Sequence, residues 1–175
     1  PRVLRRGLQR AAVGGDGGKT CANISERLTY KLSFMKLVIL EKGQNQVVAG
    51  LEGDEGHETC PVLDFLRNQP ANLQGTAKGF RALFKRYADG GRALLTSELF
   101  HEASAPEGIW EFIKGPLRVF CFQDGGNLVI LSHGNRKKRQ TANPQDVARA
   151  VELRRRFHQA KQTHQLTWME DMPHD

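Results

Sequence analysis

Apolar residues occur along the chain in short blocks whose spacing predicts both strands and helices. The apolar segment at residues 36–40 predicts a first strand. Residues 61–66 predict a short helix that starts at Pro61, because a proline at the first helical position loses no backbone hydrogen bond. A second helix is expected from about residue 72 to residue 88, where apolar side chains recur at the helical spacing: Phe80, Leu83, Phe84 and Tyr87.

Three further strands are predicted in quick succession in the second half of the chain. They cover residues 109–113, 117–123 and 128–132, and a hairpin turn at 124–127 joins the last two. Because side chains alternate along a strand, the middle one has two distinct faces. We expect Leu117, Val119 and Cys121 on one face and Arg118, Phe120 and Phe122 on the other.

Arg118 is a cation within an otherwise apolar strand, where a charge without a partner is costly. Two interpretations stay open at this point. The guanidinium forms a structural ion pair, for which Glu111 is the candidate partner, or it reaches solvent or a polar cleft at the end of the strand.

A last helix is predicted after residue 142. Asn143 is a suitable cap, Pro144 takes the first helical position, and Asp146 places an anion where the helix dipole favours it. The order is then strand, two helices, three strands and helix. This order predicts an α+β fold in which a small, antiparallel-rich sheet packs against two N-terminal helices, with one helix at the C-terminus. We expect one domain over residues 35–162, followed by a tail at 163–175.

Composition narrows the class of protein. The 175 residues, 39% of them hydrophobic, suffice for one domain with a buried core, and no apolar run approaches the ~18 residues of a membrane-spanning helix. Three cysteines, at positions 21, 60 and 121, are too few and too widely spaced for a disulfide scaffold or a zinc ribbon. We therefore expect a cytoplasmic protein that uses no metal and no cofactor.

The net charge of +7 is unevenly distributed. Residues 1–34 contain seven Lys or Arg and two Asp or Glu, and residues 133–156 contain eight and two. Such concentrated cationic segments attract polyanions, nucleic acid first among them, although a solvated helix face accounts for the second segment equally well.

Residues 1–34 are predicted to be a flexible basic leader, because they lack a sustained apolar period and contain a glycine-rich stretch at 14–18. The sequence at 17–20 resembles the end of a phosphate-binding loop, but Val13 stands where that motif requires glycine. Met35 directly precedes the first strand. We therefore interpret residues 1–34 as upstream sequence or a dispensable arm.

The densest group of chemically active residues follows the last predicted strand, at residues 132–141. It combines His133, which titrates near neutral pH, with four cations: Arg136, Lys137, Lys138 and Arg139. Cleavage of RNA by its own 2′-hydroxyl needs a base, an acid, and cations beside the phosphate, and such groups supply these without a metal. From the residues alone, a basic loop that only binds nucleic acid and a metal-free nuclease both stay open.

Three segments in this order resemble the RelE/HigB-type toxins of bacterial type II toxin–antitoxin systems, within the phage-derived branch of the RelE/ParE superfamily. They are Gly108–Phe112, Leu117–Phe122 and His133–Lys138, and the resemblance extends over about residues 35–161. It implies a RelE-like fold and a metal-independent endoribonuclease that cleaves mRNA on the ribosome and inhibits translation. It also implies a cognate antitoxin, of helix-turn-helix type, as partner.

The resemblance assigns roles to individual residues. It implies catalytic roles for Arg118, which would contact the scissile phosphate, for His133 as acid or base, and for Lys137. RNA binding is implied for Lys114, Arg136, Lys138 and Arg139. The chain departs from the family pattern at Asn135, where the family has phenylalanine, and it has no tyrosine after the basic loop.

Two other functions remain alternatives. A ParE-like protein on the same scaffold would inhibit DNA gyrase by binding alone and would have no chemical need for His133 beside a lysine pair. A basic, nucleic-acid-binding phage accessory protein would bind in a salt-dependent manner and cleave nothing.

Overall fold

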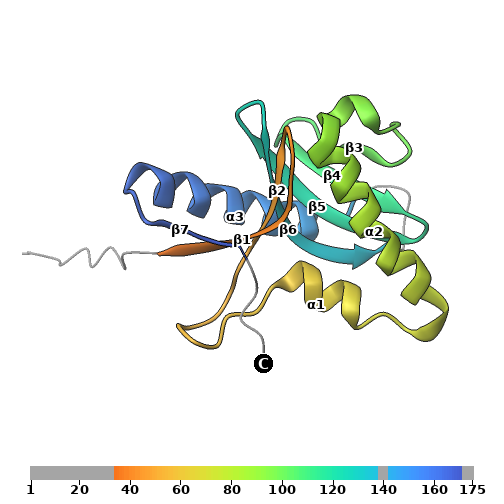
Figure 1. Cartoon of the computed structure of the whole chain (residues 1–175), viewed down its shortest axis with the longest axis horizontal. Coiled ribbons are helices and arrows are strands. Elements are labelled where there is room, and N and C mark those ends of the chain that lie inside the picture. The colour runs from red at the N-terminus through yellow and green to blue at the C-terminus, as the bar shows by residue number, and fades with distance from the viewer. Residues whose placement is uncertain (1–33, 138–141, 171–175) are drawn as a thin grey trace, which may run out of the picture. The chain divides into compact units, whose positions relative to one another are not determined.

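The computed structural model describes residues 34–137 and 142–170, and these residues form an α+β unit (Figure 1). Its elements follow in the order β1 (Met35–Lys42), β2 (Gln46–Gly50), α1 (Pro61–Arg67), α2 (Ala71–Gly90), the short 3-10 helix η1 (Gly91–Leu94), β3 (Phe100–Ser104), β4 (Ile109–Lys114), β5 (Leu117–Asp124), β6 (Leu128–Arg136), α3 (Pro144–Gln162) and β7 (Leu166–Met169).

The α+β class is confirmed, but the expected order needs correction. Two strands precede the helices, so α1 and α2 are not N-terminal, and the described sheet contains β2, β3 and β7 in addition to the predicted strands. The short β2 was missed because its apolar run leads directly into the acidic loop at residues 52–58. Strands β3 and β7 have several exposed side chains and give no alternating pattern.

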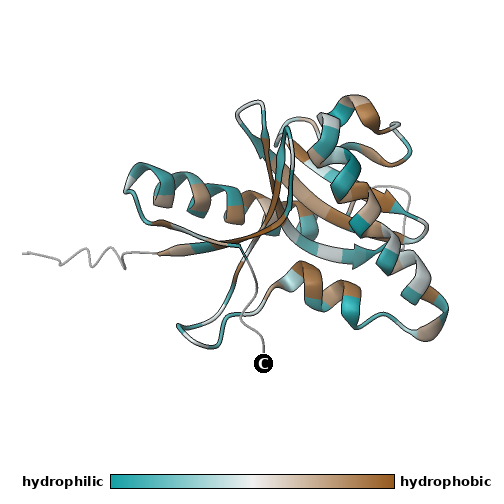
Figure 2. Ribbon diagram, viewed as in Figure 1, coloured by the Kyte–Doolittle hydropathy of each residue, from teal (hydrophilic) through white to brown (hydrophobic). Residues whose placement is uncertain are grey.

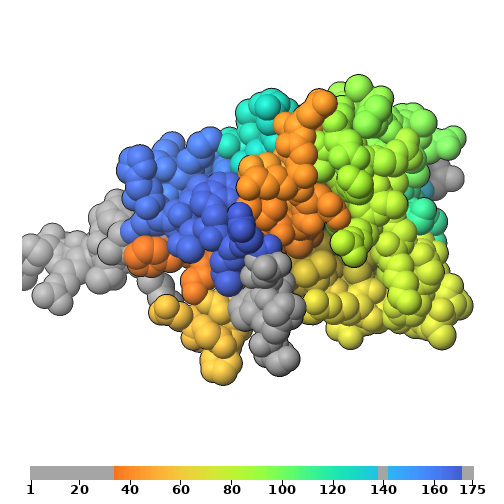
Figure 3. All heavy atoms as spheres, viewed as in Figure 1, coloured from red at the N-terminus to blue at the C-terminus, as the bar shows by residue number. Residues whose placement is uncertain are grey.

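The seven strands of the described residues form one mixed sheet in the order β3-β4-β5-β6-β2-β1-β7. Strands β3 to β6 are joined by antiparallel pairs, as are β1 and β2. Two pairs are parallel: β2 runs parallel to β6, and β7 runs parallel to β1. The segment that was expected as a tail thus contributes a strand, and Figure 3 shows this C-terminal part directly against the first strands.

Each face of the sheet carries its own hydrophobic cluster. On one face, α1 and α2 pack on Leu117, Val119 and Cys121, and the apolar stripe of α2 is buried as predicted. On the other face, α3 packs through Leu153 and Phe157, among others, on Phe120 and Phe122. The predicted division of β5 into two faces is confirmed. Figure 2 shows the result as apolar strands between helices that are polar on their outer sides.

The helix ends follow the sequence signals. Pro61 is in the first turn of α1, and Asn143 caps α3 by accepting a hydrogen bond from the backbone N–H of Gln145 (3.1 Å). Helix α2 is followed by its C-cap Gly91, whose φ of 64° lies in the left-handed region that favours glycine. None of the helices within residues 34–137 and 142–170 is both long and apolar enough to cross a membrane.

Candidate functional site

A β-bulge at Ser132 determines which side chains of β6 face helix α3. Phe120 pairs with His133, but its neighbour Cys121 pairs with Leu131, so Ser132 is the extra residue. The insertion reverses the alternation beyond it. As a result His133 and Asn135 contact residues of α3, while Gly134 contacts Phe65 of α1. Without the bulge, His133 would lie on the α1 side.

His133 is buried, with an exposed fraction of 2%, between β5, β6 and the first turn of α3. Its ring stacks on Phe120 at a centroid distance of 5.1 Å, and its Nδ1 forms a hydrogen bond of 2.9 Å with Ser132 Oγ. The Nε2 atom lies 3.5 Å from Asp146 Oδ1. No atom of the described residues forms a hydrogen bond with this Nε2.

Burial lowers the pKa of His133, and the positive charge of Arg149 lowers it further, while Asp146 acts in the opposite direction. The imidazole is therefore neutral at pH 7 and can accept a proton. This is the state that a general base requires.

Arg118 lies on the same face as His133 and forms the ion pair that was one of its two interpretations. Its Nε is 3.7 Å from Glu111 Oε1, and its Nη1 donates hydrogen bonds to the backbone oxygens of Gly115 (2.7 Å) and Leu117 (2.8 Å). Arg118 is 8% exposed and Glu111 7% exposed. Burial lowers the pKa of Arg118 and raises the pKa of Glu111.

His101 extends this polar group to the outer strand β3. Its Nε2 lies 2.9 Å from Glu111 Oε1, and half of its side chain is exposed. His101 was not predicted as a site residue. The sequence of β3 has no alternation of apolar and polar residues that would indicate which face of the sheet His101 lies on.

Lys137 follows the end of β6 at the open end of this face. Its backbone N–H donates to Pro116 O (2.7 Å), its side chain is exposed, and its charge favours the ionised form of Glu111. Lys137 follows the last residue of β6, so its link to this group of residues is its charge effect on Glu111. Of the three residues assigned to catalysis, Arg118 and His133 therefore share one face of the sheet, and Lys137 follows the end of β6.

Asn135, the departure from the family pattern, is anchored to α3 by a polar contact. Its Nδ2 donates a hydrogen bond to Asp146 Oδ2. Asp146 thus contacts both His133 and Asn135, a role that goes beyond the dipole effect predicted for it. The sequence indicated that a capped helix starts shortly after the basic loop and that Asp146 lies in its first turn. It did not indicate which strand residue the Asp146 carboxylate would contact.

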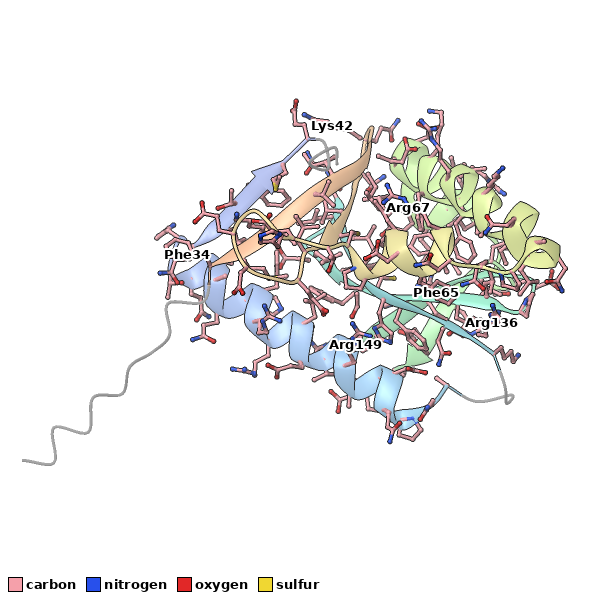
Figure 4. The ribbon with its side chains drawn as sticks, turned by 90° about the horizontal axis from the view of Figure 1, so that it is seen from below. Phe34, Lys42, Phe65, Arg67, Arg136 and Arg149 are labelled. Carbon is pink, nitrogen blue, oxygen red and sulfur yellow. The ribbon has the colours of Figure 1, made fainter. Side chains whose placement is uncertain are left out.

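Two of the residues predicted to bind RNA lie on the opposite face. Lys114 extends across Gly79 of α2, and Arg136 donates a hydrogen bond from Nε to Gln69 Oε1 (2.9 Å) at the end of α1. Figure 4 shows Arg136 and Phe65 near this end of β6, with Arg149 on α3. The structure therefore does not bring Lys114 and Arg136 together with His133. Lys138 and Arg139 lie outside the described residues.

Metal-binding geometry is not found in this site. Within residues 34–137 and 142–170, no group of three or more His, Cys, Asp or Glu side chains is placed to hold a metal ion. The tyrosine of α2 is also remote from the site, because Tyr87 is buried under the other face, and this burial raises its pKa to about 12.

Fold and site together define a class of protein: a small α+β domain in which a buried arginine and a buried histidine share one face of the sheet. The family of phage-derived Gp49-like proteins (DUF891) matches residues 64–155, more than half of the chain, and the chain belongs to this family. The match runs from α1 into α3 and includes Arg118, His133 and Lys137. A comparison with curated proteins gives no match.

Proposed function

We propose that this protein is the toxin of a type II toxin–antitoxin pair and acts as a metal-independent endoribonuclease on mRNA at the ribosome. The observation that carries the proposal is that the bulge at Ser132 turns His133 to the sheet face that carries Arg118, close to the end of β6 that Lys137 follows. Membership of a phage-derived family and the sequence resemblance to RelE/HigB-type toxins support it. An antitoxin that blocks the approach to these residues would be the natural regulator.

The chemistry assigns each residue a step. The 2′-oxygen of RNA attacks the adjacent phosphorus while its proton passes to His133 Nε2, and the bond from phosphorus to the 5′-oxygen breaks. The leaving oxygen takes a proton from the Lys137 ammonium, and Arg118 stabilises the negative charge on the phosphate. The products are a 2′,3′-cyclic phosphate and a 5′-hydroxyl.

Inducible expression of the full chain in a bacterium, with mapping of new 5′ ends on mRNA over the first minutes, tests this proposal. We expect cuts within translated codons for the wild type. His133→Gln and Arg118→Lys should reduce cleavage at least about 100-fold, the usual range for loss of acid–base or electrostatic stabilisation. Circular dichroism of the purified variants checks that each still folds. Cleavage at the wild-type level by both folded variants would place the reaction elsewhere.

One observation favours a second function, a ParE-like toxin that inhibits DNA gyrase by binding alone. His133 is 2% exposed and Arg118 is paired with Glu111, so both groups are engaged in the protein by itself. In the same experiment this function gives growth arrest with intact mRNA and inhibition of purified gyrase.

A further inference from the structure

Glu52 and Arg149 form an ion pair beside the buried His133. Glu52 belongs to the loop between β2 and α1, whose base is closed by backbone hydrogen bonds between Glu52 and Thr59 (2.9 and 2.7 Å). Arg149 belongs to α3, and its Nη2 lies 3.3 Å from both carboxylate oxygens of Glu52. The pair therefore connects the segment before α1 to the helix on the opposite face of the sheet.

The position of Arg149 on α3 places this pair at the site. Arg149 comes three residues after Asp146, so the two side chains are neighbours on one side of the helix. Asp146 contacts His133 directly. After burial, the charges of Arg149 and Asp146 are the main influences on the pKa of His133, and the charge of Glu52 contributes as well. Figure 4 shows Arg149 on α3.

Arg149 can also exchange Glu52 for another anionic partner at little cost. Both side chains are about half exposed, at 49% and 43%, and an exposed ion pair contributes little to stability. A phosphate offers the guanidinium the same paired-oxygen geometry as a carboxylate. His133, by contrast, is enclosed, and its Nε2 has no hydrogen bond from any part of the chain that the structure describes.

We propose that Glu52 occupies Arg149 in the RNA-free protein as a substitute for an RNA phosphate, and that an incoming phosphate displaces Glu52 and opens access to His133. Arg149 is thereby a phosphate-binding residue of the site, and Glu52 an autoinhibitory one. This inference rests on the proposed function in so far as RNA is the ligand.

The test measures binding of a 2′-O-methyl RNA oligonucleotide, which cannot be cleaved by the 2′-oxygen, to the full chain by fluorescence anisotropy at several salt concentrations. Glu52→Gln should tighten binding about threefold to fivefold. The substitution removes the carboxylate that competes with the RNA phosphate for Arg149, and an exposed ion pair of this kind contributes a free energy of that size. Arg149→Gln should weaken binding and lower the slope of log affinity against log salt by about 0.7, the value for one phosphate contact on a single strand.

Helix α3 offers a matched control in a second exposed pair, Arg155 with Glu152 (2.7 Å), which lies on the same helix. Glu152→Gln and Arg155→Gln make the same charge changes and should alter affinity and salt slope much less. A second readout is the accessibility of His133 to diethylpyrocarbonate, which should rise in Glu52→Gln and stay unchanged in Glu152→Gln.

The outcomes separate this inference from the proposed function. Equal effects of Glu52→Gln and Glu152→Gln overturn the inference, even where mRNA cleavage through His133 is found. Tighter binding and a more accessible His133 in Glu52→Gln support it, even where no cleavage occurs and the nuclease proposal fails. Absence of RNA binding by the wild type and all variants overturns it as well.

Discussion

At the scale of the residue, His133 is the group on which most of the site depends. Its ring is fixed by Ser132 through Nδ1 and by stacking on Phe120, which leaves Nε2 for chemistry. A hydroxyl can donate or accept, so this hydrogen bond orients the ring and is compatible with either tautomer. The candidate base is therefore held in one orientation before RNA arrives.

The lowered pKa of His133 predicts a dependence of stability on pH. As the pH falls through the ordinary histidine value of ~6.5, the unfolded chain takes up a proton at this residue before the folded chain does, so the folded state loses stability. We expect the free energy of unfolding in urea to fall more between pH 8 and pH 5.5 for the wild type than for His133→Gln.

His57→Gln serves as the control for this measurement, because His57 is exposed in the loop before α1. This variant keeps the buried imidazole and is the reference against which the pH dependence of His133→Gln is compared with that of the wild type. If His133→Gln matches the wild type, the imidazole is not enclosed in solution as the structure describes it.

At the scale of the element, strand β6 and helix α1 meet so closely that a side chain at Gly134 has no room. A Cβ atom there would lie 1.9 Å from Cδ1 of Phe65. The glycine thus determines how near α1 comes to the strand that carries His133.

We therefore predict that Gly134→Ala lowers the free energy of unfolding by about 1–3 kcal/mol, the range for overpacking a buried contact. The double variant with Phe65→Leu should recover part of this loss, because the smaller side chain leaves space for the new methyl group. Urea denaturation measures both effects.

The matched control is Gly126→Ala in the hairpin between β5 and β6, where a Cβ would meet no atom of the described residues within 4 Å. This variant should change stability by less than about 0.5 kcal/mol. Equal losses in the two single variants would show that the contact of α1 with β6 is looser than described.

Most of the elements could be predicted from the sequence, because periodic apolar positions and strong end signals depend only on nearby residues. The stripe of α2 and the cap at Asn143 are examples. The site was less predictable. The face on which His133 lies depends on the bulge at Ser132. A bulge arises from the pairing of two strands, so it cannot be predicted from the sequence of either strand alone.

At the scale of the whole molecule, the sheet depends on parallel pairs between distant segments. The parallel pairing of β2 with β6 and that of β1 with β7 were not predicted, because pairing between distant segments is determined by packing in the complete fold. The same holds for the contact of Arg149 with Glu52, whose partners lie 97 residues apart. Local patterns carry no information about such contacts.

The pairing of β7 predicts unequal effects of substitutions within this strand. Leu166 is half-buried against the cluster under α3, whereas Thr167 is exposed. Leu166→Ala should lower the free energy of unfolding by about 1–2 kcal/mol, about half of the value for a fully buried leucine. Thr167→Ala should change it by less than about 0.5 kcal/mol. Indistinguishable effects in urea denaturation would mean that β7 is not docked on β1.

The place of β1 between β2 and β7 has a consequence for how the chain is made. Strand β1 is synthesised before its parallel neighbour β7, because every other element of the sheet lies between them in the sequence. One edge of β1 therefore stays open until β7 has been made, and distant pairing of this kind forms late and slowly. A nascent chain that has not yet reached β7 cannot close this edge of the sheet, so a binding partner that is already present can meet β1 while its edge is open.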